Sequence, residues 1–116
     1  MEKELGVVQI QNNKGGIMKI LEKKEDFKEL ISNGKVLVDF YADWCGPCKM
    51  LSPVLEEFDK ENKDIEVVKV NVDNFQKLAK EYGVMSIPNL VVFKDGEVVN
   101  NNVGFIDKDS LVDLVK

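Results

Sequence analysis

The sequence predicts an α/β sandwich in which a mixed β-sheet lies between layers of helices. Two observations carry this prediction. Apolar runs typical of strands alternate with amphipathic stretches along most of the chain, and a late Asp-Gly turn separates two strand-like runs. Helical crossovers place neighbouring strands parallel, whereas a tight hairpin adds an antiparallel edge. The 116 residues, 44% of them apolar, suffice for one such domain.

Residues 1–16 differ from the rest of the chain and are treated as an N-terminal extension. Their apolar residues suggest a short strand: Leu5, Val7, Val8 and Ile10. The polar, glycine-containing stretch 11–16 predicts a turn or a linker. The domain itself is therefore expected to span residues 17–116.

The first half of the domain predicts a strand, a helix and a second strand. Residues 17–21 suit a strand, and residues 26–33 suit a helix that Asp26 caps at its start. Residues 36–41 are a nearly continuous apolar run that contains one carboxylate, Asp39. Such a run is typical of a strand covered on both faces, which indicates a sheet between two helix layers.

Two further helices and a strand are predicted next. The apolar stripe over residues 50–58 has helical spacing, and Pro53 is expected to bend that helix. Residues 65–72 alternate as a strand does. Asp73 together with Gln76 then predicts the capped start of another helix.

The end of the domain predicts a hairpin followed by a last helix. Residues 90–93 and 97–99 are rich in strand-forming residues, and Asp95-Gly96 between them is a strong hairpin signal. Asp107 is placed to cap the last helix. The apolar residues of that helix are Leu111, Leu114 and Val115.

Charge and composition exclude several classes of function. The chain has 21 acidic and 16 basic residues and a net charge of −5, and lysines and acids are interspersed, which argues against nucleic-acid binding. Because the chain has no histidine, Ser-His and Cys-His nucleophilic dyads and imidazole metal sites are excluded. The standard glycine-rich phosphate-binding loops are also absent from the sequence.

Neither membrane insertion nor secretion is expected. The sequence has no apolar run long enough for a membrane span, and its N-terminal residues lack the pattern of a secretory signal. The two cysteines are too close in sequence to staple the chain, and the lack of others suits a reducing compartment. We therefore expect a cytoplasmic protein, with a monomer as the default.

Cys45 and Cys48 are the residues expected to carry chemistry. Cys45 is predicted at a helix N-terminus, where unpaired amides and the helix dipole stabilise a thiolate, and Cys48 lies one turn further in. Such a pair can cycle between dithiol and disulfide and exchange with a disulfide of another protein. Zinc needs two more ligands, usually Cys or His, so no metal site is expected unless two chains share an ion or cluster.

Residues 38–49, VDFYADWCGPCK, resemble the active-site segment of the thioredoxin family. Three further segments recur in the family's order: Ser86–Leu90, Phe93–Val98 and Val103-Gly104. The resemblance covers roughly residues 17–116. It implies the thioredoxin fold, a three-layer α/β/α sandwich with a central mixed β-sheet.

The resemblance also implies a role for each matching residue. Cys45 would attack a substrate disulfide, and Cys48 would resolve the mixed disulfide. Asp39 would lie buried behind the pair and exchange a proton with Cys48, and Lys69 would tune Asp39. Pro88 would follow a cis peptide bond. The docking surface would consist of Trp44, Gly46, Pro47, Ile87, Pro88, Val103 and Gly104.

The function implied by the resemblance is reduction of protein disulfides without a bound cofactor. Electrons would come from a separate thioredoxin reductase. The Gly-Pro pair between the cysteines is typical of reducing members of the family. Two alternatives remain at this point: a docking subunit that uses the same apolar surface without turnover, and an oxidant. Tyr41 and Asn89 depart mildly from the family pattern, while Phe105 replaces a small residue and is expected to affect the choice of partner.

Overall fold

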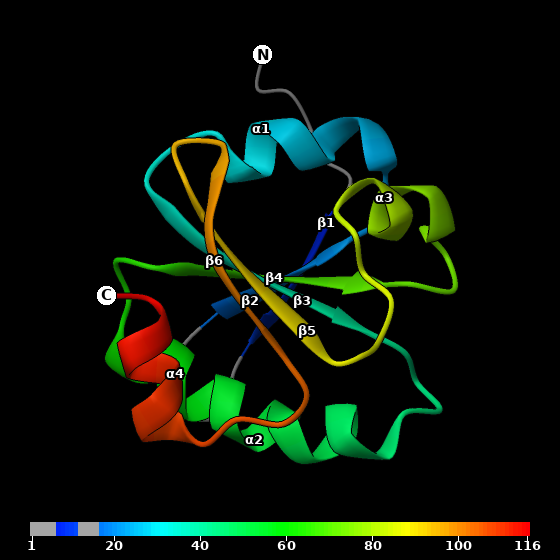
Figure 1. Ribbon diagram of the computed structural model, residues 1–116. Coiled ribbons are helices and arrows are strands. Elements are labelled where there is room, and N and C mark those ends of the chain that lie inside the picture. The colour runs from blue at the N-terminus through cyan, green and yellow to red at the C-terminus, as the bar shows by residue number, and fades with distance from the viewer. Residues whose placement is uncertain (1–6, 12–16) are drawn as a thin grey trace.

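The computed structural model describes residues 7–11 and 17–116, and it confirms the predicted α/β sandwich (Figure 1). The strands are β1 (Val7–Gln11), β2 (Ile17–Leu21), β3 (Lys35–Tyr41), β4 (Glu66–Asn71), β5 (Asn89–Lys94) and β6 (Glu97–Val103). The helices are η1 (Lys24–Asp26), α1 (Phe27–Ile31), α2 (Gly46–Glu61), α3 (Gln76–Glu81) and α4 (Lys108–Leu114). Over these described ranges, no helix is both long and apolar enough to cross a membrane.

The strands form a mixed sheet in the order β1-β2-β4-β3-β5-β6. β2 and β3 both run parallel to β4, whereas β5 is antiparallel to β3 and to β6, as the helical crossovers and the hairpin predict. β1 pairs antiparallel with β2, so a strand does form before residue 17. Gln11, which was predicted in the turn or linker over 11–16, is instead the last residue of β1. The expected contribution of Leu5 to the strand, and residues 12–16 of the predicted linker, lie outside the described residues.

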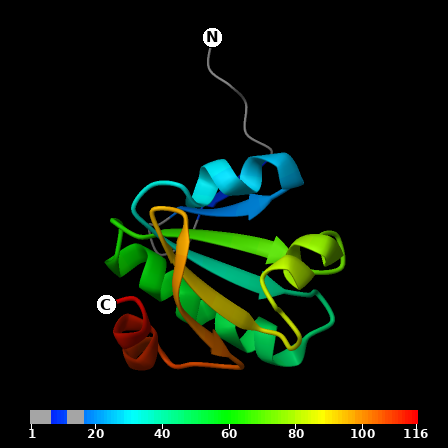
Figure 2. The ribbon, with the colours of Figure 1, turned by 45° about the horizontal axis from the view of Figure 1, so that its top comes forward.

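Helices cover both faces of the sheet, with α1 and α3 on one side and α2 and α4 on the other (Figures 1 and 2). Successive side chains of β3 point alternately to the two helix layers. Val36, Val38 and Phe40 pack in the core under α1 and α3, whereas Leu37 packs in the core under α2 and α4. Because side chains alternate along a strand, Asp39 lies on the same face as Leu37. The fold therefore places the one carboxylate of this run on the side of α2.

Asp26 and Asp107 both take the predicted N-cap positions, but only Asp107 makes the side-chain hydrogen bond of a cap. Asp26 ends a 3-10 turn that leads straight into α1, and its backbone is already helical at φ −89° and ψ −6°. Its side chain makes no cap hydrogen bond, because capping needs an extended backbone. Asp107 has that extended backbone, and its Oδ1 accepts a hydrogen bond of 2.8 Å from the Ser110 N–H.

Asp73 does not cap α3, although its sequence context predicts that role. The helix begins at Gln76, and Phe75 takes the N-cap position without a side-chain cap hydrogen bond. The Asp73 carboxylate instead accepts a hydrogen bond from Trp44, far earlier in the chain. A tertiary contact therefore replaces the local one.

The hairpin turn between β5 and β6 depends on the conformation of Gly96. Asp95 and Gly96 have φ values of +50° and +88°, the pattern of a type I′ turn. We expect Gly96→Ala to lower the free energy of unfolding by about 1 kcal/mol, because an L side chain resists this conformation. Urea unfolding checks this, with Gly46→Ala as the control, since Gly46 has no positive φ and open space around it. An equal cost in both variants would contradict the prediction.

Candidate active site

Four chain segments meet at one edge of the sheet. Because β3 and β4 are parallel, their carboxyl ends lie together, which is where ligands bind in α/β sheets. β5 runs antiparallel to β3 and so begins at this edge, and β6, antiparallel to β5, ends there. The topology thus gathers the loop with the cysteines, the turn after β4, the segment around Pro88 and the end of β6.

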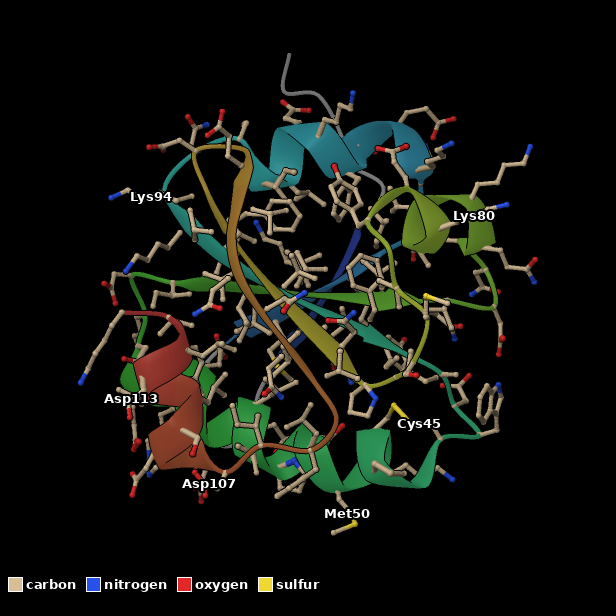
Figure 3. The ribbon with its side chains drawn as sticks, in the orientation of Figure 1. Cys45, Met50, Lys80, Lys94, Asp107 and Asp113 are labelled. Atoms are coloured by element: carbon tan, nitrogen blue, oxygen red, sulfur yellow. A yellow bond between two sulfur atoms is a disulfide. The ribbon has the colours of Figure 1, made fainter. Side chains whose placement is uncertain are left out.

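Cys45 and Cys48 form a disulfide at the start of α2, with their Cα atoms 5.2 Å apart (Figure 3). Cys45 is the N-cap residue, and Cys48 lies within the first turn, after Pro47. The Cys48 N–H donates a hydrogen bond of 3.2 Å to the Cys45 Sγ. Both cysteines are buried in this oxidised state. A helix N-terminus with an amide directed at sulfur favours the thiolate once the disulfide is reduced.

A groove of about 510 Å³ lies beside Cys45. Its lining is uncharged: Trp44, Cys45, Gly46, Pro47, Val72, Ala79, Val84, Met85, Ser86 and Ile87. Trp44 is 70% exposed and Met85 is 94% exposed. The groove therefore offers a mostly apolar contact surface next to the cysteine sulfur, and exposed apolar surface of this kind marks a binding site.

The remaining predicted docking residues lie around Pro88. The Ile87–Pro88 peptide bond is cis, and the Gly104 N–H donates a hydrogen bond of 2.7 Å to the Pro88 carbonyl. This bond joins the end of β6 to the segment before β5. Val103 and Phe105 on either side of Gly104 are exposed. Val103 and Gly104 do not line the groove, so the predicted surface has two parts, one in the groove and one attached to Pro88.

Asp39 and Lys69 are neighbours on adjacent strands. They are register partners in the parallel pairing of β3 with β4. Asp39 is 1% exposed, and its Oδ1 has no hydrogen-bond partner. Burial raises the pKa of Asp39 to about 7, although the Lys69 ammonium acts to lower it. Asp39 is thus a carboxyl group that can gain and lose a proton near neutral pH.

A small cavity of about 120 Å³ connects Lys69 with the second cysteine. Its lining residues are Tyr41, Ala42, Asp43, Cys48, Lys49, Ser52 and Lys69. The Lys69 Nζ lies 4.5 Å from the centroid of the Tyr41 ring and donates a long hydrogen bond of 3.5 Å to the Ser52 Oγ. Burial, together with the charges of Asp43 and Asp39, raises the pKa of Tyr41. Lys69, the register partner of Asp39, therefore shares this cavity with Cys48.

Several residues at the site were not predicted from the sequence as site residues. Asp73 accepts a 2.9 Å hydrogen bond from the Trp44 Nε1, and Asn71 accepts a 2.9 Å hydrogen bond from the Asp73 N–H. Asn71 lies at the carboxyl end of the strand predicted over 65–72, and Asp73 directly follows that strand, a position that could have marked both as site residues. Met85, a large apolar residue just before Ile87, could have been noticed as an exposed groove contact.

Comparisons with known proteins agree with this site. The family model for thioredoxin matches residues 18–116. Thioredoxin from Bacillus subtilis is 55% identical over 92 residues, which cover 78% of this chain and 88% of that protein. Thioredoxin from Chlamydia caviae is 52% identical over 91 residues, which cover 78% of this chain and 89% of that protein.

Solved structures show the same architecture. A mutant thioredoxin from Halobacterium salinarum matches with a TM-score of 0.78 and 46% identity, covering 83% of this chain and 85% of that one. Oxidised mitochondrial thioredoxin 3 from Saccharomyces cerevisiae matches with a TM-score of 0.76 and 35% identity, covering 82% of this chain and 91% of that one. These likenesses confirm the thioredoxin fold.

The fold, the cysteine pair and the matched relatives all indicate the same activity. A cysteine pair that closes a disulfide on this fold is a thiol-disulfide oxidoreductase site, and the named thioredoxins support protein-disulfide reductase activity. The family implies protein substrates and recycling by thioredoxin reductase. The chain belongs to the thioredoxin family.

Proposed function

We propose that Cys45 is the sulfur that attacks protein disulfides and that Cys48 resolves the product. One observation carries this assignment: Cys45 is the N-cap residue of α2, and its Sγ accepts a hydrogen bond from the Cys48 N–H at 3.2 Å. The helix N-terminus stabilises negative charge at Cys45 and so favours its thiolate in the reduced protein. Cys48 lies inside the first turn, where this stabilisation is weaker.

The reaction transfers two electrons from the cysteine pair to the substrate. The Cys45 thiolate attacks one sulfur of the substrate disulfide, forms a mixed disulfide and releases the first substrate thiolate. The Cys48 thiolate then attacks the Cys45 Sγ and releases the second substrate thiolate. The substrate is reduced to a dithiol, and the chain ends with the Cys45–Cys48 disulfide that the structure contains. A separate reductase must return two electrons to that disulfide.

Asp39 supplies and accepts the proton of Cys48 in this scheme. Cys48 must lose its thiol proton before it attacks, and a carboxyl group with a pKa of about 7 can take that proton near neutral pH. Lys69 limits the rise in the pKa of Asp39 by its positive charge. The 120 Å³ cavity lined by Cys48 and Lys69 is large enough to hold water, and Lys69 is the register partner of Asp39.

Substrate docking uses the groove and the cis peptide bond. The uncharged groove suits apolar side chains of a substrate near its disulfide, and its proposed contacts are Trp44, Gly46, Pro47 and Ile87. The cis Ile87–Pro88 bond lies just before β5, which begins at Asn89, and we assign to the Ile87 backbone the pairing with an extended substrate segment. Val103 and Gly104 would extend this surface beyond Pro88.

The setting we propose is a monomer in the cytoplasm, recharged by a thioredoxin reductase. Two observations support it: both cysteines are engaged in the redox pair, and the matched relatives include bacterial thioredoxins. We assign the domain to residues 17–116 and treat residues 1–16 as an extension, since the family match begins at residue 18.

Covalent trapping tests the two cysteine roles. We expect Cys48→Ser to accumulate mixed disulfides with proteins of a cell extract, because Cys45 can attack but nothing resolves the product. Non-reducing electrophoresis and mass spectrometry after release with dithiothreitol measure the captured proteins. Cys45→Ser is the matched control and is expected to capture none above background. Greater capture by Cys45→Ser would reverse the assignment, and no capture by either variant would refute exchange through this pair.

A further inference from the structure

We propose that Asn71 is a positioning residue that holds Trp44 at the wall of the groove by fixing Asp73. The inference rests on the proposed function, since the orientation of Trp44 matters for activity only if protein substrates dock in this groove. Asn71 touches none of the reacting sulfur atoms, so its effect passes entirely through the loop that carries Trp44.

Trp44 needs a tether because packing covers little of it. Its side chain is 70% exposed, yet it forms one wall of the groove beside Cys45. The Trp44 Nε1 donates a hydrogen bond of 2.9 Å to the Asp73 Oδ2. This bond links the loop after β3 to the turn after β4, and it restrains the orientation of the indole ring.

Asp73 can act as a tether only if its own turn is held in place. Asp73 is exposed, and its N–H donates a hydrogen bond of 2.9 Å to the Asn71 Oδ1. Asn71 is the last residue of β4, is 9% exposed, and is the register partner of Tyr41 in β3. The sheet therefore anchors Asn71, which in turn anchors Asp73.

The other end of the Asn71 amide reaches the residue before Trp44. The Asn71 Nδ2 donates a long hydrogen bond of 3.5 Å to the Asp43 Oδ2. One side chain thus accepts from the turn after β4 and donates to the loop after β3. An amide side chain can make both hydrogen bonds, to Asp43 and from Asp73, because it carries a donor and an acceptor. Aspartate here would set a second carboxylate against Asp43, and leucine would remove both bonds.

The expected consequence is a change in docking and not in chemistry. Without the Asn71 bonds, the indole of Trp44 samples more orientations, and a substrate must order it on binding. The hydrogen bond between the Cys48 N–H and the Cys45 Sγ lies within α2 and is not affected. We therefore expect Asn71→Leu to raise the KM for insulin about fivefold, the equivalent of one lost hydrogen bond, with little change in kcat.

A direct readout of the tether is available because Trp44 is the single tryptophan of the chain. Its indole N–H gives one NMR signal, and we expect that proton to exchange with water about tenfold faster in Asn71→Leu than in the wild type. Asp73→Ala removes the carboxylate that accepts the indole hydrogen bond, so its exchange rate sets the upper limit for the Asn71 variants. Asn74→Leu, in the same turn, is the matched control and is expected to leave the exchange rate unchanged.

Two controls separate positioning from general damage. The rate at which reduced protein attacks a small aromatic disulfide, dithiobis(nitrobenzoate), is expected to be the same in Asn71→Leu and the wild type, since that reagent does not need the groove. If Asn71→Leu fails to fold, Asn71→Asp replaces it, because aspartate keeps the acceptor and loses the donor. It is expected to show a smaller rise in exchange.

The proposal is overturned if indole exchange is unchanged in both Asn71 variants, if the KM for insulin stays the same while exchange quickens, or if attack on the small disulfide slows in step with insulin reduction. A wild-type protein that reduces no insulin would refute the proposed function instead. In that case the exchange rates would still show whether Asn71 positions Trp44.

Discussion

Replacing Cys45 by serine is expected to abolish protein-disulfide reduction. Serine keeps the size of the side chain and can still cap α2 by accepting the Cys48 N–H, so the fold of the loop is preserved. Its hydroxyl does not ionise near neutral pH and cannot form a disulfide. We expect kcat/KM for insulin to fall at least about a thousandfold, a loss of more than about 4 kcal/mol of transition-state stabilisation.

The matched comparison is Cys48→Ser, which should also lose multiple turnover but for a different reason. Reduced Cys48→Ser is expected to release one thiolate per protein molecule from a model disulfide and then stop, whereas reduced Cys45→Ser releases none. A turbidity assay for insulin and a thiol-release assay measure the two effects. Insulin reduction by Cys45→Ser above the rate of dithiothreitol alone would remove Cys45 from its assigned role.

The sequence predicted an element correctly where burial or backbone conformation alone decides which residue types fit, as in β3 and in the turn between β5 and β6. Every inner position of β3 is buried between two helix layers, so the run from Val36 to Phe40 is apolar apart from Asp39, and its pattern indicates a covered strand. The Asp95-Gly96 turn needs positive φ at both central residues, and this demand limits the residue types that fit. Local sequence and tertiary structure agree at these places.

The predicted cap at Asp73 failed because a distant group competes for its side chain. Asp73 precedes α3 at a plausible capping distance, but its carboxylate accepts the Trp44 Nε1–H, 29 residues earlier in the chain. A local pattern cannot contain that partner. The same reason explains why Asn71 was not singled out: its importance follows from the meeting of two loops at the parallel ends of β3 and β4.

The candidate site was predictable to the extent that its residues fall in contiguous motifs. Cys45 and Cys48 lie in one segment, and the burial of Asp39 follows from its apolar neighbours. The groove is different, because Val84 and Met85 become part of it only when the segment before Pro88 lies against the Trp44 loop. Contacts between segments of this kind have no period or spacing in the sequence.

Asp39 shows that the fold holds a carboxyl group in an environment that disfavours its charge. Burial raises its pKa from 3.8 to about 7, and Lys69 opposes this only in part. Ionising Asp39 therefore costs the folded protein about 4 kcal/mol more than it costs the unfolded chain. A stability cost of this size at the working pH is consistent with a residue kept for proton transfer and not for structure.

Replacing Asp39 by asparagine is expected to stabilise the oxidised protein in a pH-dependent way. Below pH 4 the Asp39 carboxyl is mostly protonated in both the folded and the unfolded chain, so Asp39→Asn gains little free energy of unfolding over the wild type. Between pH 4 and about 7 the unfolded chain releases the proton while the folded protein keeps it, so wild-type stability falls as pH rises. Above pH 7 we expect Asp39→Asn to exceed the wild type by about 4 kcal/mol in the free energy of unfolding.

Urea unfolding of both proteins at pH 4, 5.5 and 8 checks this, because groups common to both cancel in the difference. Asp107→Asn is a control of opposite sign: hydrogen bonds from Ser110 lower the pKa of Asp107, so its contribution is present above the unfolded pKa and is lost on acidification. Lys69→Met should raise the pKa of Asp39 further, since it removes the charge that lowers it. A stability gain in Asp39→Asn that is the same at pH 4 and pH 8 would show that packing, and not the buried charge, distinguishes the variant.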